Sequence, residues 1–379
     1  MLKRYLLPVV IFVLATVILV FSPSLSESFR PAALGQQEFA RAQVIEVLEQ
    51  NLLRDYRVPS VVTGDQRLNV RILEGSQQGA EVEVHNSLNR LHNVHVAAGD
   101  RFILMVREGA VRDVHWAYNH DRAGAVYWML GLMVVLILLL GKMQGLNSLI
   151  SLYFTGALVI GVLIPGLFAG WHPVLLTVAL MALKIVVNFL LVAGYNRKSL
   201  VAMLGTLGGV IVAGVMAQYF GEMAQLNGLY LDKGEDLIHL SPDNALQIRW
   251  LLFVAIMISA LGAVMDVAIS MASSYHELRE ANPQQPESER LLATINIGRD
   301  IMGTMTNTLI LAFAGSSLTT IMMVWGFQMP LMQFMNIPAI SLAMIHALAG
   351  SIGLILTIPF TVICASVLYN HPRFQRRNG

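Results

Sequence analysis

The chain has 379 residues, of which 55% are hydrophobic and 13% are charged, and its formal net charge is +1. Soluble domains usually carry about 25% charged residues, so the composition excludes an ordinary soluble protein. The small net charge gives no sign of nucleic-acid binding. A single cysteine, Cys364, excludes an intrachain disulfide and a cysteine-rich metal site.

Eight apolar segments predict a polytopic α-helical membrane protein, because about 20 apolar residues are needed to cross a bilayer. The first segment, residues 5–21, follows Lys3 and Arg4 and is interpreted as an uncleaved signal-anchor span within residues 1–28. If it were cleaved, seven spans would remain in the same orientation. The other segments are residues 124–141, 147–169, 173–194, 199–220, 249–273, 300–325 and 338–366.

The spans predict two membrane groups, residues 123–220 with four spans and residues 249–366 with three, separated by an outer loop at 221–248. Lys and Arg gather in the short segments of one side, including Lys142, Arg197 and the basic tail at 367–379. Because such residues mark the cytoplasmic side, both termini are expected in the cytoplasm.

A polar insert at residues 29–122 predicts a small extracytoplasmic β-rich domain. Short runs with turn signals between them predict five strands in a barrel-like arrangement, similar to OB or SH3 barrels. Nucleic-acid binding is rejected, since no basic aromatic strip is visible, and a rigid cap or assembly module is favoured. The predicted strands are Ala42–Glu46, Leu68–Leu73, Ala80–His85, Phe102–Val106 and Val111–Tyr118.

Two predicted spans carry charged residues that are expensive in lipid. Lys184 and Asn188 are four residues apart and share a helix face near mid-membrane. Asp266 is the natural counter-ion for Lys184, and it belongs to a stripe of small polar residues that includes Ser270. The pair could serve transport, or it could serve assembly alone.

A second polar face is predicted in the segment NIGRDIMGTMTNTL. Asn296, Asp300, Thr304 and Asn307 fall at i, i+4, i+8 and i+11, which is one continuous helical face. This spacing predicts one wall of a path that enters from the cytoplasm. The alternative is a hydrogen-bonded seam between helices.

Other polar or metal-binding candidates are weaker. His346 could relay protons or be structural. Met329, Met332 and Met335 recur at three-residue spacing, which would suit Cu(I), but methionine also fills apolar gaps, so no metal site is assigned. Intramembrane proteolysis by Asp266 and Asp300 is disfavoured, because the segment IGRD lacks a GxGD pattern.

The segments LGAVMDVAIS, HELREANP and NIGRDIMGTMTNTLILAFAGSSL resemble the YibE/F family of bacterial multispan membrane proteins. The similarity extends to GTLGG and to RLNVRILEGSQQGAEVEVHN and GDRFIL in the insert, with Ala-Phe at 312–313 where the family has Ala-Tyr. The matched charged residues are Asp266, Glu277, Arg299 and Asp300. The resemblance implies an inner-membrane protein of unknown function, often presumed to transport, and supplies no catalytic residue.

We therefore expect a secondary transporter or permease for an unidentified small solute or ion, and not an enzyme. No cofactor is expected, since no P-loop is present. The alternative is a non-catalytic assembly or sensing subunit that acts through its β-rich domain. The expected partners are the lipid bilayer and the solute, and a homo-oligomer or a membrane partner is left open.

Overall fold

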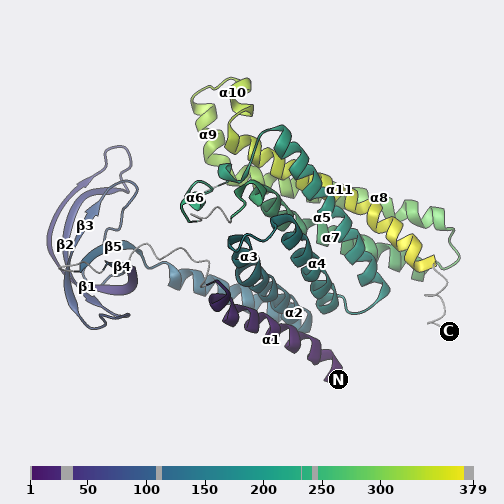
Figure 1. Cartoon of the computed structure of the whole chain (residues 1–379), viewed down its shortest axis with the longest axis horizontal. Coiled ribbons are helices and arrows are strands. Elements are labelled where there is room, and N and C mark those ends of the chain that lie inside the picture. The colour runs from purple at the N-terminus through teal and green to yellow at the C-terminus, as the bar shows by residue number, and fades with distance from the viewer. Residues whose placement is uncertain (1, 27–36, 108–112, 232, 241–245, 371–379) are drawn as a thin grey trace. The chain divides into compact units, whose positions relative to one another are not determined.

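The computed structural model describes residues 2–26, 37–107, 113–231, 233–240 and 246–370, and the chain divides into two compact units (Figure 1). The sheet unit comprises Pro31–Ile137, and the helical unit comprises Met1–Arg30 together with Leu138–Gly379. Val111, Ser28 and residues 371–379 of the predicted tail lie outside the described residues.

The sheet unit is an antiparallel five-stranded half-barrel, so the β-rich insert predicted from the sequence is present. The strand order is β3-β2-β1-β4-β5, and the two edge strands, β3 and β5, contact each other without joining as neighbours in the sheet. β1 bends at two register shifts and pairs with both β2 and β4. The strands are β1 Gln37–Arg54, β2 Val62–Ile72, β3 Glu81–Leu88, β4 Arg101–Arg107 and β5 Val114–His120.

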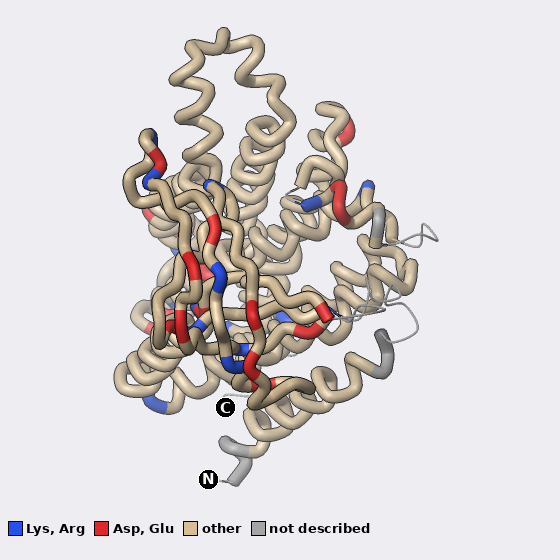
Figure 2. Tube along the Cα trace, turned by 90° about the vertical axis from the view of Figure 1, so that its left-hand side faces the viewer, with Lys and Arg blue, Asp and Glu red and all other residues tan. Residues whose placement is uncertain are grey.

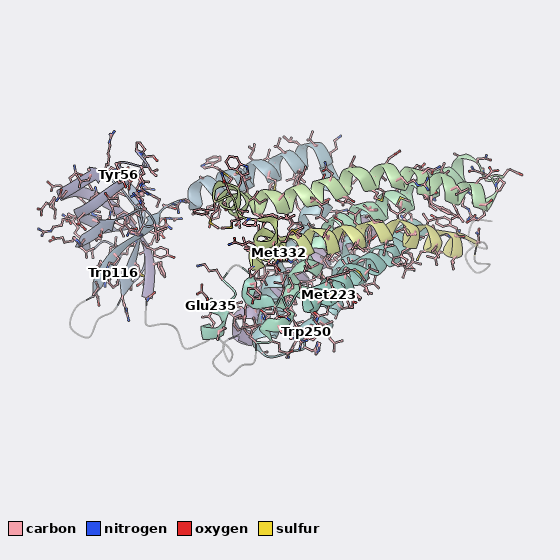
Figure 3. The ribbon with its side chains drawn as sticks, turned by 90° about the horizontal axis from the view of Figure 1, so that it is seen from above. Tyr56, Trp116, Met223, Glu235, Trp250 and Met332 are labelled. Carbon is pink, nitrogen blue, oxygen red and sulfur yellow. The ribbon has the colours of Figure 1, made fainter. Side chains whose placement is uncertain are left out.

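Apolar residues alternate along the strands and fill the interior of the half-barrel, as the period of two in a strand requires. Leu68, Val70 and Phe102 are fully buried there. Two buried amides, Gln66 and Asn86, donate to the carbonyls of the segment that leads into β4, at 3.0 Å to Val96 and 2.8 Å to Val94. Longer exposed side chains such as Tyr56 and Trp116 stand on the outside (Figure 3).

The helical unit is built from long apolar helices joined by short turns. Its first helix, α1, packs through Ile11 and Ala15, and the Phe12 ring stacks on Tyr153 with centroids 5.3 Å apart. The helices are α1 Leu2–Ser26, α2 Ala123–Leu158, α3 Ile164–Phe168, α4 Pro173–Val192, α5 Arg197–Met223, α6 Asp236–Leu240, α7 Leu251–Ala281, α8 Glu287–Ser316, α9 Leu318–Gly326, α10 Leu331–Met335 and α11 Pro338–Asn370.

Among the described residues, six helical stretches are long and apolar enough to cross a membrane, or seven if the bent pair α8–α9 counts as one span. Eight were predicted. The difference arises because the predicted spans 124–141 and 147–169 fall within one helical stretch, Ala123–Phe168. That stretch is broken at Lys142, which has φ 46° and ψ −124°, a conformation that ends regular helix.

The predicted span 300–325 is also corrected. α8 begins at Glu287, well before the apolar run, and α9 continues from it after a bend of 64°. The bend coincides with Gly315, Ser316 and Ser317, small residues that hold a helix less firmly. Beyond it, α9 and α10 carry large exposed side chains such as Met332 (Figure 3).

The core of the helical unit forms where α5, α7 and α11 meet. Gly209 of α5 lies where an added Cβ would come within 2.8 Å of Val264 and 3.0 Å of the Gly353 carbonyl. Such contacts between small residues bring helices close together. Charged residues colour the strands in Figure 2, whereas long stretches of the helices carry none.

Candidate functional site

A polar cluster joins α2, α4 and α7 inside the helical unit. Ser151 donates to the Oδ1 of Asn188 at 2.6 Å, and the amide nitrogen of Asn188 lies 2.7 Å from the sulfur of Met265. The ammonium of Lys184 lies 3.8 Å from the same sulfur. The structure therefore brings Lys184 and Asn188 together, as their spacing predicts, and adds Ser151 and Met265.

Lys184 has no direct ion pair with any described residue. Asp266 is near enough to interact with it electrostatically, but the two do not come within 4 Å. Lys184 is half-buried, while Asp266 is exposed on α7, where Ser270 donates to its backbone carbonyl at 2.8 Å. Asp266, the counter-ion suggested by the sequence, is thus separated from Lys184, and the sulfur of Met265 lies closer to the ammonium.

Asp266 and the polar part of α8 lie at similar levels along antiparallel helices. Gly298 of α8 faces Met271 of α7, while Leu309 and Ala260 both face Gly350. Asp266 falls between these two levels. The structure therefore places the candidate residues of α4, α7 and α8 at a common depth within the unit.

The predicted face of α8 is continuous, but it points away from the packed helices. Asn296, Asp300, Thr304 and Asn307 are all exposed, while Thr294 and Gly298 on the opposite side are buried. The reason is that α8 uses its apolar residues to pack against α7 and α11. The four residues therefore face away from the core of the helical unit, and their role in a path stays a prediction.

His346 lies apart from these residues, on α11. Its Nε2 atom is buried with no hydrogen-bond partner among the described residues, and its ring lies 5.4 Å from that of Phe313. The imidazole is thus held among apolar groups. Its proposed relay role stays a prediction.

A buried arginine at the turn between α7 and α8 is not among the site residues predicted from the sequence. Arg290 is only 4% exposed and pairs with Glu287 at 3.1 Å, and Glu287 accepts a hydrogen bond from the Tyr275 hydroxyl at 2.7 Å. The burial of Arg290 was not predicted, because the segment around it alternates charged residues with Pro and Gln, a composition typical of loops. The cluster anchors the start of α8 on α7.

Chemically, the site offers separated charges and amides. Among the described residues, no group of three or more His, Cys, Asp or Glu side chains could hold a metal ion. Lys184 supplies a cation, Asp266 and Asp300 supply anions, and Asn188 and Asn307 supply both donors and acceptors. Such groups suit reversible binding of a polar solute, an ion or a proton.

Comparison with known proteins identifies a family. No curated protein and no solved structure matches the chain. The model of the family described as "YibE/F-like protein" matches residues 129–371, a range that begins after the last strand, β5, and covers more than half of the chain. The sequence resemblance noted above is thereby confirmed, and the chain belongs to the YibE/F-like family.

Proposed function

We propose that the chain is an inner-membrane protein with both termini in the cytoplasm, and that it moves a small solute or ion as a secondary transporter. The observation that carries the proposal is the separated pair of Lys184 and Asp266 in the middle of apolar helices. Ionisable groups in a membrane interior are expensive and commonly mark solute or proton pathways.

The depth of Lys184 supports this placement. It lies 11 residues after Pro173, the first residue of α4, which is roughly 16 Å along the helix at 1.5 Å per residue. That is near the middle of a hydrocarbon core of about 30 Å, so its ammonium cannot reach either surface easily.

In the proposed cycle, a proton or cation binds to Asp266 and weakens its attraction for Lys184. The ammonium then relaxes toward the sulfur of Met265, which already lies 3.8 Å from it and also contacts Asn188. Release of the proton or cation on the other side restores the attraction. Asp300, Thr304 and Asn307, on the exposed face of α8 at the depth of Asp266, offer further polar groups.

An Asp266→Asn substitution tests the role of that carboxylate. The variant keeps the shape of the side chain and removes its charge, so we expect it to fold and to lose the solute change caused by the wild type. Ions and small metabolites are measured in cells and medium for both proteins at matched membrane levels, and a solute that shifts is tested in liposomes.

The control is Asp65→Asn, which removes an exposed carboxylate in the sheet unit. It should behave as the wild type. Normal solute movement by the Asp266→Asn protein would contradict the proposed role of Asp266. If no solute shifted with any variant, weight would move to the alternative, an assembly or sensing subunit that acts through the sheet unit.

A further inference from the structure

The polar segment of α8 lies at the middle of the helical unit. α8 and α11 run side by side (Figures 1 and 3). Gly298 lies against Ile358, and Leu309 lies against Gly350. Both contacts are close to residue 354, the midpoint of α11, which spans Pro338–Asn370. In a membrane, Asp300, Thr304 and Asn307 would therefore be at mid-bilayer depth.

This segment presents its polar side outward. The carboxylate of Asp300 and the amide of Asn307 are exposed and make no hydrogen bond or ion pair with any residue that the structure describes. Thr304 only donates to the carbonyl of Ile301 in its own helix. Lipid tails offer no partner to such groups, so another protein surface must cover them.

The spacing of the outward residues fits a second helix of the same kind. Asn296, Asp300, Gly303 and Asn307 follow one another at intervals of four, three and four, which is the seam of a left-handed helix pair. At Gly303 an added Cβ would have no heavy atom within 4 Å, so a partner helix has room to approach.

The chemistry of the face is also self-complementary. Arg299 lies beside Asp300 and is exposed, so across a twofold axis it can pair with Asp300 of a second copy. Asn307 has both a donor and an acceptor and can bond to Asn307 of the second copy. A surface that carries both charges and both hydrogen-bonding roles suits a symmetric interface.

We propose that this α8 face, defined by Asn296, Asp300, Gly303, Thr304 and Asn307, is the interface with a second copy of the chain. Two α8 helices then pair in parallel at the middle of the membrane, and the residues predicted to line a path lie between the copies. The inference rests on the membrane placement proposed above and does not depend on transport.

Cysteine cross-linking of the full chain tests the interface. In a Cys364→Ala background, one cysteine is placed at Gly303 or Asn307, and the matched control is Leu356→Cys, at the same depth on an exposed apolar part of α11. Membranes are treated with a copper–phenanthroline oxidant. We expect Gly303→Cys and Asn307→Cys to form a disulfide-linked species of twice the chain mass, and Leu356→Cys to stay monomeric.

A second measurement gives the mass of the cysteine-free protein in detergent by light scattering. We expect a dimer, and we expect the double substitution Asp300→Leu, Asn307→Leu to give a monomer with unchanged helix content by circular dichroism. A monomeric parent protein would overturn the proposal, and so would linkage at Leu356 without linkage at Gly303 or Asn307. A species linked to a different protein would also overturn it.

The test of the interface and the test of transport can fail independently. A dimer linked through Gly303 that moves no solute would count against the transporter alone. An active monomer would count against the interface alone.

Discussion

At the scale of single residues, Asp55 shows how one carboxylate ties two loops of the sheet unit together. Its side chain is 6% exposed, pairs with Arg90 at 2.6 Å, and accepts the backbone N–H groups of Arg57 and Val58. The hydrogen bond from Arg90, helped by these N–H groups, lowers the pKa of Asp55 from 3.8 to about 2, against the opposing effect of burial. The loops after β1 and β3 therefore depend on the charge of Asp55.

The first residue-scale prediction concerns pH. Because the pKa of Asp55 is lower in the folded state, the charged carboxylate stabilises the loops above pH 3.8, and this stabilisation is lost as pH falls toward about 2. Asp55→Asn should reduce the protection of the amides of Arg57 and Val58 at neutral pH. The difference from the wild type should shrink as pH falls from about 4 to about 2.

The measurement is hydrogen exchange of the full chain, corrected for intrinsic rates. Asp65→Asn is the control, since the Asp65 side chain is 54% exposed. Equal protection in Asp55→Asn and the wild type at neutral pH would show that the charge does not hold the loops.

The candidate residues could be identified from the sequence, but their contacts could not. Lys184 and Asp266 are conspicuous because charge is rare in apolar helices, and their similar depth predicted that they would approach each other. The sequence could not show that Met265, rather than Asp266, contacts the ammonium of Lys184, since side-chain direction depends on how α4 and α7 rotate. Arg290 was missed because burial of an arginine is set by its partners, Glu287 and Tyr275, and these become neighbours only when the helices pack.

At the scale of elements, the contact of α5 with α11 organises the helical unit. Gly353 lies where an added Cβ would meet the Ala213 side chain at 2.6 Å and the Gly209 carbonyl at 2.7 Å. Gly205 and Gly209, a GxxxG pair in α5, face Thr361 and Thr357 of α11. The two helices form a close-packed pair, so in the proposed transport cycle rearrangement is expected elsewhere.

A glycine substitution tests this pair. Gly209→Ala places a methyl group against Thr357, Val264 and the Gly353 carbonyl, and overpacking of this kind typically costs about 1–3 kcal/mol. The matched control, Gly156→Ala in α2, has no heavy atom within 4 Å of its new methyl group and should be neutral or stabilising by up to about 1 kcal/mol. Thermal unfolding in detergent compares them, and equal stability would contradict the close packing.

Element types were easier to predict than element ends. Alternating apolar residues predicted the strands, and long apolar runs predicted the helices, because these patterns reflect burial directly. The predicted spans 124–141 and 147–169 leave a gap in which the break at Lys142 falls. The bend after Ser316 was not predicted, since hydropathy averages over a window and does not register a local change of direction. The sequence also could not predict that the polar face of α8 points outward, because the same spacing fits an inner or an outer face.

At the scale of the whole molecule, the break at Lys142 decides the relation of the two termini. The stretch Ala123–Phe168 has 46 residues and is roughly 69 Å long as helix, about twice the hydrocarbon core. If it crosses twice, the crossings number eight and both termini face the same side. If it crosses once, they number seven and the termini face opposite sides.

Reporter fusions test this count. Given the positive residues near both ends, we expect an alkaline phosphatase fused after residue 379 to be inactive and a green fluorescent protein fused there to be fluorescent, as on the cytoplasmic side. The same pair fused within the sheet unit, after Gly79, should give the reverse result. An active phosphatase at the C-terminus would indicate an odd number of crossings.

The packing of α1 carries a consequence for how the protein is made. Thr16 of α1 contacts the Tyr153 hydroxyl at 3.3 Å, across a separation of 137 residues. At roughly 5–20 residues per second, synthesis of the intervening chain takes about 7–27 s, during which the entire sheet unit is made. In the proposed placement, α1 waits in the bilayer for that time without Tyr153. The Thr16 hydroxyl also donates to the carbonyl of Phe12 in its own helix at 2.9 Å, so it has a partner before Tyr153 arrives.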